Sequence, residues 1–162
     1  RQPWETIMTF TLTSPAFQNN APIPDQHARD GENLSPQLDW SDPPEGTQSF
    51  VLIMEDPDAP SAPTFRHWAV YDIPRDRRHL APGRSSGANT ESLPHAFNDF
   101  GNLRYDGPQP PAGDPPHHYR FRLAALDVPK LDVPDQPYAG DLWEAARAHI
   151  LSEAELVGTY QA

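Results

Sequence analysis

The sequence predicts a β-rich sandwich, because it combines strand-like apolar segments, many proline turns and a single helical pattern near its end. Residues 50–54 are a continuous apolar run, Phe-Val-Leu-Ile-Met, which is typical of a central strand buried on both faces. Residues 67–71 form a second such segment and end shortly before Pro74. The chain has 21 prolines in 162 residues, and proline interrupts helices. Many short strands with one late helix favour a sandwich over a helical bundle or an alternating α/β fold.

Further strands are predicted where apolar and polar residues alternate. Threonine alternates with Phe10 and Leu12 over residues 9–13, which indicates a half-buried strand. Residues 38–40 predict a short strand between proline turns. Residues 119–123 alternate Tyr, Phe and Leu with two arginines, so one face of this strand should contact water. Residues 75–102 contain several glycines and asparagines and are expected to be mostly loop.

Two elements are predicted near the C-terminus. Apolar residues at helical spacing predict a helix that begins at residues 140–141, with Asp141 as its N-cap. The residues expected to share its buried face are Leu142, Ala145, Ala146, His149 and Ile150. Ser152 and Glu155 have the spacing of a capping box, which would begin another helix. Residues 156–160 are β-prone and contain a glycine, so we predict a terminal strand there instead.

Length and composition limit the classes of protein to which this chain can belong. Its length fits one domain, which we place at residues 8–162, with residues 1–7 as an extension that is non-native or disordered. The 23 acidic residues outnumber the 12 basic ones and give a net charge of −11, which argues against nucleic acid and anionic membranes as partners. No apolar run is long enough for membrane insertion, and the first residues show no signal segment, so a cytoplasmic protein is expected. The chain has no cysteine, which excludes thiol chemistry.

Two proline-rich blocks carry the residues that indicate a site. The first block, residues 56–60, reads Asp-Pro-Asp-Ala-Pro and leads to His67. The second, residues 107–113, reads Gly-Pro-Gln-Pro-Pro-Ala-Gly and leads to His117 and Tyr119. Proline fixes its own φ and restricts the residue before it, so both blocks should be rigid. A rigid loop that carries a carboxylate, histidines and a phenol predicts the wall of a small polar pocket.

These blocks, with other segments in the same order, resemble the phosphatidylethanolamine-binding protein (PEBP) family, which includes the Raf kinase inhibitor proteins. The other segments are Ser14–Phe17, Asp30–Trp40, Asn98–Gly101, Tyr105–Pro108 and Leu151–Tyr160. The spacing is most similar to the short bacterial and archaeal branch. The resemblance implies a large antiparallel sheet flanked by a smaller one, with a few peripheral helices. Eukaryotic members have a second histidine where this chain has Arg66.

The resemblance also implies a function and a set of site residues. Such proteins have a pocket for a small anion, such as phosphate or a phospholipid head group, and need no cofactor. The residues that match this pocket are Asp56, His67, His117 and Tyr119, with Pro60 and Pro111 as walls and Asp58 and Gly107 beside them. Small bacterial relatives tend to form homodimers, so a two-fold dimer is expected. We also expect the Ala59–Pro60 bond to be cis, as the family habit suggests.

The chemistry of these residue types fits an anion. A histidine titrates near neutral pH and donates through both nitrogens when it is charged. We expect Asp56 to pair with His67 and to fix its orientation. His67 and Tyr119 would then donate hydrogen bonds to phosphate or carboxylate oxygens, and the prolines would exclude water.

Several alternatives remain open from the residues themselves. Residues 56–60 alone predict only a turn with Asx hydrogen bonds. A metal site of His117, His118, His67 and Asp56 is disfavoured, because adjacent residues on a strand point to opposite faces. A hydrolase that uses Ser61 lacks a nucleophile motif. The same Asp, His and Tyr could also perform acid–base chemistry on a small molecule, and a regulator of a kinase or protease is a third class. The residues favour a binding protein over an enzyme.

Overall fold

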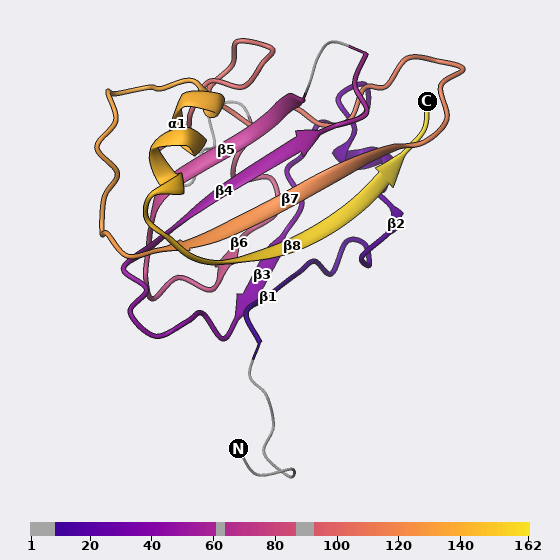
Figure 1. The fold of residues 1–162 in the computed structure, drawn as a ribbon. Coiled ribbons are helices and arrows are strands. Elements are labelled where there is room, and N and C mark those ends of the chain that lie inside the picture. Colours follow the sequence, from indigo (N-terminus) through magenta and orange to yellow (C-terminus); the bar gives the residue numbers. More distant parts are fainter. Residues whose placement is uncertain (1–8, 61–63, 87–92) are drawn as a thin grey trace, which may run out of the picture.

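The structure, a computed structural model, describes residues 9–60, 64–86 and 93–162. It contains two β-sheets and one α-helix (Figure 1). The five-stranded sheet has the order β2 (Ala21–Pro22), β8 (Ile150–Tyr160), β7 (His117–Leu126), β4 (Ser49–Asp56) and β5 (Phe65–Pro74). The three-stranded sheet has the order β1 (Thr11–Thr13), β3 (Leu38–Ser41) and β6 (His79–Leu80). A 3-10 helix, η1 (Asp25–His27), and helix α1 (Ala139–Arg147) complete the described elements.

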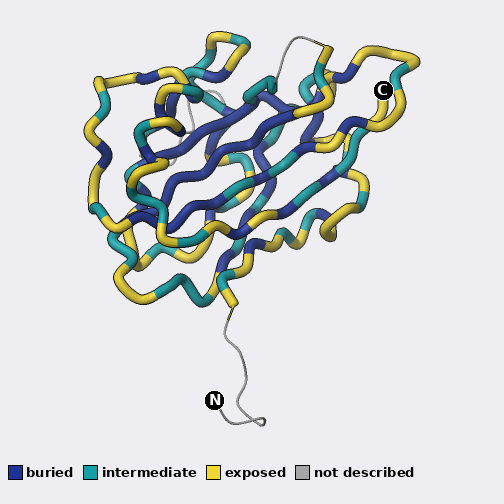
Figure 2. Tube along the Cα trace, viewed as in Figure 1, coloured by how far each residue is buried: buried dark blue, intermediate teal, exposed yellow. Residues whose placement is uncertain are grey.

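The larger sheet is the middle layer, with the smaller sheet on one face and α1 on the other (Figure 1). Alternate residues of β4 supply both interfaces. Phe50, Leu52 and Met54 pack toward the smaller sheet, whereas Val51 and Ile53 pack toward α1. Every residue of β4 is buried, and its neighbours in the sheet are also buried along much of their length (Figure 2). The continuous apolar run of the sequence is therefore a strand covered on both faces, and the predicted β-rich sandwich is confirmed.

The strands predicted from alternation are present: β3 and β7 extend beyond the predicted residues 38–40 and 119–123, whereas β1 covers only Thr11–Thr13 of the predicted residues 9–13. The terminal strand begins at Ile150 and includes Ser152 and Glu155, so the capping-box pattern does not begin a helix. Strands β2 and β6 were not predicted, because two-residue strands carry no readable alternation. The proposed boundary at residue 8, the extension at residues 1–7 and Ser61 lie outside the described residues.

Two details of the predicted helix are wrong. The N-cap is Tyr138, whose side chain makes no capping hydrogen bond, and Asp141 lies inside the first turn. There its carboxylate still interacts favourably with the positive end of the helix dipole. The helix ends at Arg147, so His149 and Ile150 are not on its buried face, and Ile150 begins β8 instead. No helix in the described parts of the chain has the length and apolarity needed to cross a membrane.

The ends of three neighbouring strands meet at one end of the larger sheet. The C-terminal end of β4 lies there beside the N-terminal ends of β5 and β7, at the upper right in Figure 1. Near this end β5 carries a bulge. Met54 pairs with Trp68 and Glu55 pairs with Arg66, so His67 has no partner on β4. A bulge lets two successive side chains lie on one side of a sheet. His67 accordingly packs against Tyr119 while Trp68 packs against Tyr105, both on the side of the smaller sheet.

Candidate functional site

A cavity of about 170 Å³ lies at this end of the larger sheet. Its lining comes from the end of β4, the start of β5, the start of β7 and three loops. The lining residues are Asp56, Ala59, Pro60, Phe65, His67, Phe100, Gln109, Pro110, Pro111, His117 and Tyr119. Six of the eight predicted site residues are among them. The structure therefore brings together two blocks that are about fifty residues apart in the sequence.

The other two predicted residues, Asp58 and Gly107, do not line the cavity. The Asp58 carboxylate points to the outer surface, where it accepts hydrogen bonds from the backbone N–H of His118 (2.8 Å) and from its ring Nδ1 (2.9 Å). Gly107 is buried behind the cavity wall, and its N–H donates to Asn33 Oδ1 at 2.7 Å. The hydrogen bonds of both residues hold the loops beside the cavity in place.

Asp56 pairs with His117 and not with His67, which corrects the expected pairing. Asp56 Oδ2 lies 2.7 Å from His117 Nδ1. Its other oxygen, Oδ1, accepts the backbone N–H of Asp58 at 2.7 Å. This Asx turn reverses the chain with trans prolines. No peptide bond of the described residues is cis, so the expected cis Ala59–Pro60 bond is wrong.

His67 is fixed by the backbone of the neighbouring loop. Its Nδ1 donates to the carbonyl oxygen of Asp106 at 2.8 Å, because a carbonyl can only accept. Burial lowers the pKa of His67, although the Asp106 carbonyl and the Asp56 carboxylate oppose this change. The neutral ring therefore carries its proton on Nδ1. The backbone carbonyl of Gly107 also lies near the ring and raises its pKa, but the bond from Nδ1 to Asp106 is the one hydrogen bond of good geometry that the ring makes with the described residues. Nε2 can accept from a ligand when neutral and donate to one when protonated.

The loop that holds His67 is built around the buried carboxylate of Asp106. Burial raises the pKa of Asp106, but hydrogen bonds from Asn102, Asn98 and Asn33 outweigh this effect and leave it lowered. Asn98 also donates to the His67 carbonyl oxygen at 3.2 Å. The side chain of Asp106 is thus a charged anchor, while its backbone orients His67. Asn98 and Asp106 lie in two of the segments that carry the family resemblance, but no pattern in the sequence predicts the hydrogen bond between them.

Tyr119 supplies a buried phenol with an unused hydrogen bond. The residue is fully buried, and its Oη has no hydrogen-bond partner among the described residues. Burial and the nearby Asp56 raise the pKa of Tyr119, and the backbone N–H of Gln109, which approaches Oη without the geometry of a hydrogen bond, lowers it to a smaller extent. The phenol therefore keeps its proton at neutral pH and is a donor. A buried polar group without a partner is rare in native proteins and requires an explanation.

Aromatic rings and prolines surround the polar groups. The His67 ring contacts Phe65 and Phe100 edge to face, with centroids 5.1 Å and 5.4 Å away. Phe100 is in turn covered by Arg29, whose guanidinium carbon lies 4.0 Å from the ring centroid. Phe65, Phe100 and Gln109 were not predicted as site residues. Phe65 could have been found from its position two residues before His67, but Phe100 comes from a distant loop.

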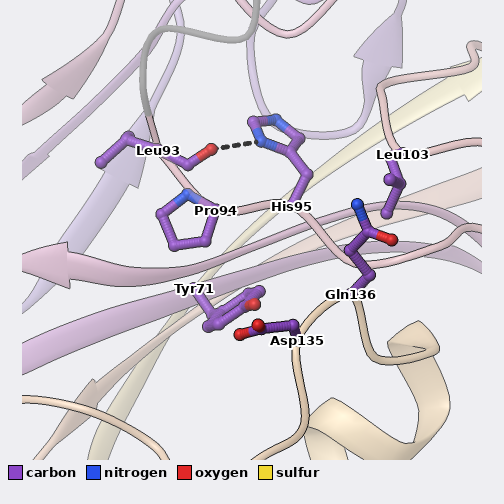
Figure 3. A pocket seen from close by; sticks show the side chains of 7 residues that line it. All are labelled: Tyr71, Leu93, Pro94, His95, Leu103, Asp135 and Gln136. Carbon is purple, nitrogen blue, oxygen red and sulfur yellow. Dashed lines mark hydrogen bonds between the residues drawn. The ribbon is translucent and has the colours of Figure 1, made fainter.

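A larger hollow, of about 580 Å³, lies elsewhere on the structure (Figure 3). It contains the buried His95, whose Nδ1 donates to Leu93 O at 2.9 Å and whose Nε2 lies 2.9 Å from Ser85 Oγ. Both nitrogens are therefore used within the protein, and burial lowers the pKa of this ring. Asp135 and Gln136, on the rim, are exposed. Size alone does not make this hollow the functional site, because its buried histidine has no free nitrogen for a ligand.

The positions of the histidines bear on the alternative of a metal site. His117 is buried and His118 is exposed, as expected for adjacent residues on a strand. Among the residues that the structure describes, no three His, Asp or Glu side chains are arranged to hold a metal ion. His27 and His95 are also buried, and each ring bonds to a backbone carbonyl, of Leu34 and Leu93 respectively.

The geometry defines a β-sandwich protein with a small cavity, polar at its floor and apolar at its rim, at one end of its larger sheet. A model of the family described as phosphatidylethanolamine-binding protein matches residues 13–161. A UPF0098 protein of Aquifex aeolicus is 41% identical over 148 residues, which cover 91% of this chain and 86% of the relative. The chain therefore belongs to the phosphatidylethanolamine-binding protein family, as the resemblance indicated.

Solved structures agree with this assignment. YbcL of Escherichia coli, described as a member of the mammalian PEBP family, superposes with a TM-score of 0.90 at 32% identity, covering 94% of this chain and 98% of YbcL. CT736 of Chlamydia trachomatis, described as a PEBP homolog, gives a TM-score of 0.84 at 36% identity, covering 96% of this chain and 99% of that protein.

Proposed function

We propose that this protein binds a small ligand through an anionic group, of the phosphate or carboxylate type, in the cavity at the end of the larger sheet. The observation that carries this proposal is the buried Tyr119 hydroxyl, which lacks a partner and sits between two histidines. A ligand oxygen is the acceptor that such a donor requires. His67 supplies the second donor once its Nε2 is protonated.

The apolar part of the lining supports the same function. Ligand sites combine an apolar surface with a few placed polar groups. Here Pro60, Phe65, Phe100 and Pro111 surround the polar floor. This rim excludes water, which strengthens hydrogen bonds from His67 and Tyr119 to an anion. A volume of about 170 Å³ is suited to a head group rather than to a whole lipid.

Titration with sulfate, followed by calorimetry or by NMR of the histidine rings, tests the proposal. Sulfate carries no proton near neutral pH, so it reports the charge of the protein alone. Saturable binding with shifts of the His67 resonances supports the function. Failure of both sulfate and phosphate to bind, at every pH at which the protein stays folded, contradicts it.

The Tyr119→Phe variant is expected to bind sulfate more weakly without loss of stability. The phenol contributes about one hydrogen bond to the complex, or about 0.5–1.5 kcal/mol of binding free energy. In the free protein the same hydroxyl is buried without a partner, so its removal should leave the free energy of unfolding unchanged or raise it. Denaturant unfolding and calorimetry measure the two effects. A loss of stability together with unchanged affinity would show that the hydroxyl serves the fold.

Sulfate affinity is expected to rise as the pH falls, with a midpoint below the ordinary histidine value. Burial lowers the pKa of His67, so in the free protein the ring becomes protonated only at a pH below that value. Bound sulfate favours the charged ring and therefore raises the pKa of His67 in the complex. Phosphate should show a weaker pH dependence, because its monoanion brings a proton that it can donate to neutral Nε2. Calorimetry across a pH series distinguishes the two anions.

A further inference from the structure

His117 separates the cavity from a shallow hollow on the outer surface. The hollow is lined by Asp58, Asp114, Pro115, Pro116, His117 and His118. On the cavity side, His117 Nδ1 lies 2.7 Å from Asp56 Oδ2. On the side of the hollow, Nε2 lies 2.9 Å from Asp114 Oδ2. One histidine thus joins a buried carboxylate to a half-exposed one.

Both ring nitrogens of His117 face carboxylate oxygens, which only accept hydrogen bonds. The form of the ring that satisfies both carboxylates is the imidazolium, with a proton on each nitrogen. Burial lowers the pKa of His117, but the hydrogen bonds and charges of Asp56 and Asp114 outweigh burial and raise it. His117 is therefore a cation whose two N–H groups both donate to carboxylates, and neither nitrogen is free to donate to a ligand.

The position of Asp114 is set by its own loop. Its backbone N–H donates to Pro111 O at 3.2 Å, and its carbonyl oxygen accepts Gln161 Nε2 at 3.0 Å. The preceding Gly113 has a φ of +92°, a conformation that other residues rarely adopt. These contacts fix the chain on both sides of the carboxylate, which places Oδ2 against the ring.

We propose that Asp114 is a positioning residue of the site, which holds the His117 imidazolium from the solvent side so that Asp56 meets the ligand as one half of an ion pair. The inference rests on the proposed function, because it answers how an anion can enter a cavity that contains a carboxylate. A bare Asp56 would repel an anion, whereas an Asp56 neutralised by His117 does not. Asp114 keeps that neutralising proton in place as the pH rises.

Other titratable groups also surround His117 and have to be separated from Asp114. Asp58 and His118 lie in the outer hollow, Tyr119 stacks at a centroid distance of 6.5 Å, Tyr160 is its partner on β8, and His67 lies beyond Tyr119. Among the described residues, only Asp56 and Asp114 form hydrogen bonds with the ring. The Asp58→Asn variant is therefore a matched control, since it removes the same charge from the same hollow and leaves both hydrogen bonds of the His117 ring in place.

NMR titration of the His117 ring tests the positioning directly and needs no ligand. The Asp114→Asn variant should lower the pKa of His117 by about one unit, because an opposite charge in hydrogen-bond contact is lost. The Asp114→Glu variant keeps a carboxylate and should restore most of the difference. Asp58→Asn should change the pKa of His117 much less, because Asp58 forms its hydrogen bonds with His118 and not with the His117 ring. An unchanged His117 pKa in Asp114→Asn overturns the inference.

Sulfate binding by the same variants tests the consequence for the site. At a pH between the two measured His117 pKa values, Asp114→Asn should bind about tenfold more weakly than the parent, the cost of an uncompensated charge near the anion. At a pH below both values, the two proteins should bind alike. A loss of equal size at every pH overturns the inference, because it would indicate a purely structural effect. If neither protein binds sulfate while the His117 pKa shifts as expected, the proposed function fails and the positioning of His117 by Asp114 stands.

Discussion

Replacement of His67 by alanine is expected to remove most sulfate binding and most of its pH dependence. His67 is the histidine of the cavity whose ring makes one hydrogen bond of good geometry with the described residues, whereas both nitrogens of His117 are occupied by carboxylates. A hydrogen bond to a charged group contributes about 1.5–3 kcal/mol, so affinity should fall by roughly tenfold to a hundredfold. Calorimetric titration at a pH at which the parent binds well measures the loss.

A control is needed, because His67 is buried and its removal also costs stability. His95→Ala is matched, since His95 is a buried histidine that likewise donates to a backbone carbonyl and likewise has a lowered pKa. Both variants should lose free energy of unfolding, but only His67→Ala should lose sulfate binding. If His67→Ala binds sulfate as well as the parent does, the site assignment is wrong and family membership informs the fold alone.

Replacement of Gly107 by alanine is expected to destabilise the protein by about 3 kcal/mol, near the upper end for overpacking. A Cβ at this position would lie 1.9 Å from His27 O and 2.9 Å from His27 C, so backbone rather than a movable side chain must shift. Gly107 leads into the residues 109–111 that line the cavity. The variant should therefore also weaken sulfate binding. Denaturant unfolding gives the first effect and calorimetry the second.

The same substitution, glycine to alanine, at Gly140 in helix α1 serves as the control. At Gly140 a Cβ would meet only the guanidinium of Arg66, at 3.4 Å, which is an ordinary contact with a flexible group. Alanine is favoured over glycine inside a helix by about 1 kcal/mol. Gly140→Ala is therefore expected to leave stability unchanged or raise it. Equal stability of the Gly107→Ala and Gly140→Ala variants would show that the backbone of the loop before the cavity can shift at little cost in free energy.

The sequence by itself determined the class of fold and the composition of the site. Residues 50–54 had to be buried on both faces, because an apolar run without alternation has no face to leave in water. The two proline blocks predicted rigid loops, and six of the eight residues drawn from them and from the following strands line one cavity. These features depend on local chemistry and on the order of motifs along the chain.

The pairing of the site residues was decided only by the tertiary structure. Alternation from Trp68 would place His67 on the opposite face of β5, and the bulge opposite Met54 and Glu55 is what brings both rings to the same side. Asp56 pairs with His117 because β4 and β7 are neighbours in the sheet, whereas His67 is held by Asp106, which lies 39 residues further along the chain. Register, bulges and loop contacts arise from packing between distant segments. A pattern with a period of two residues contains no information about them.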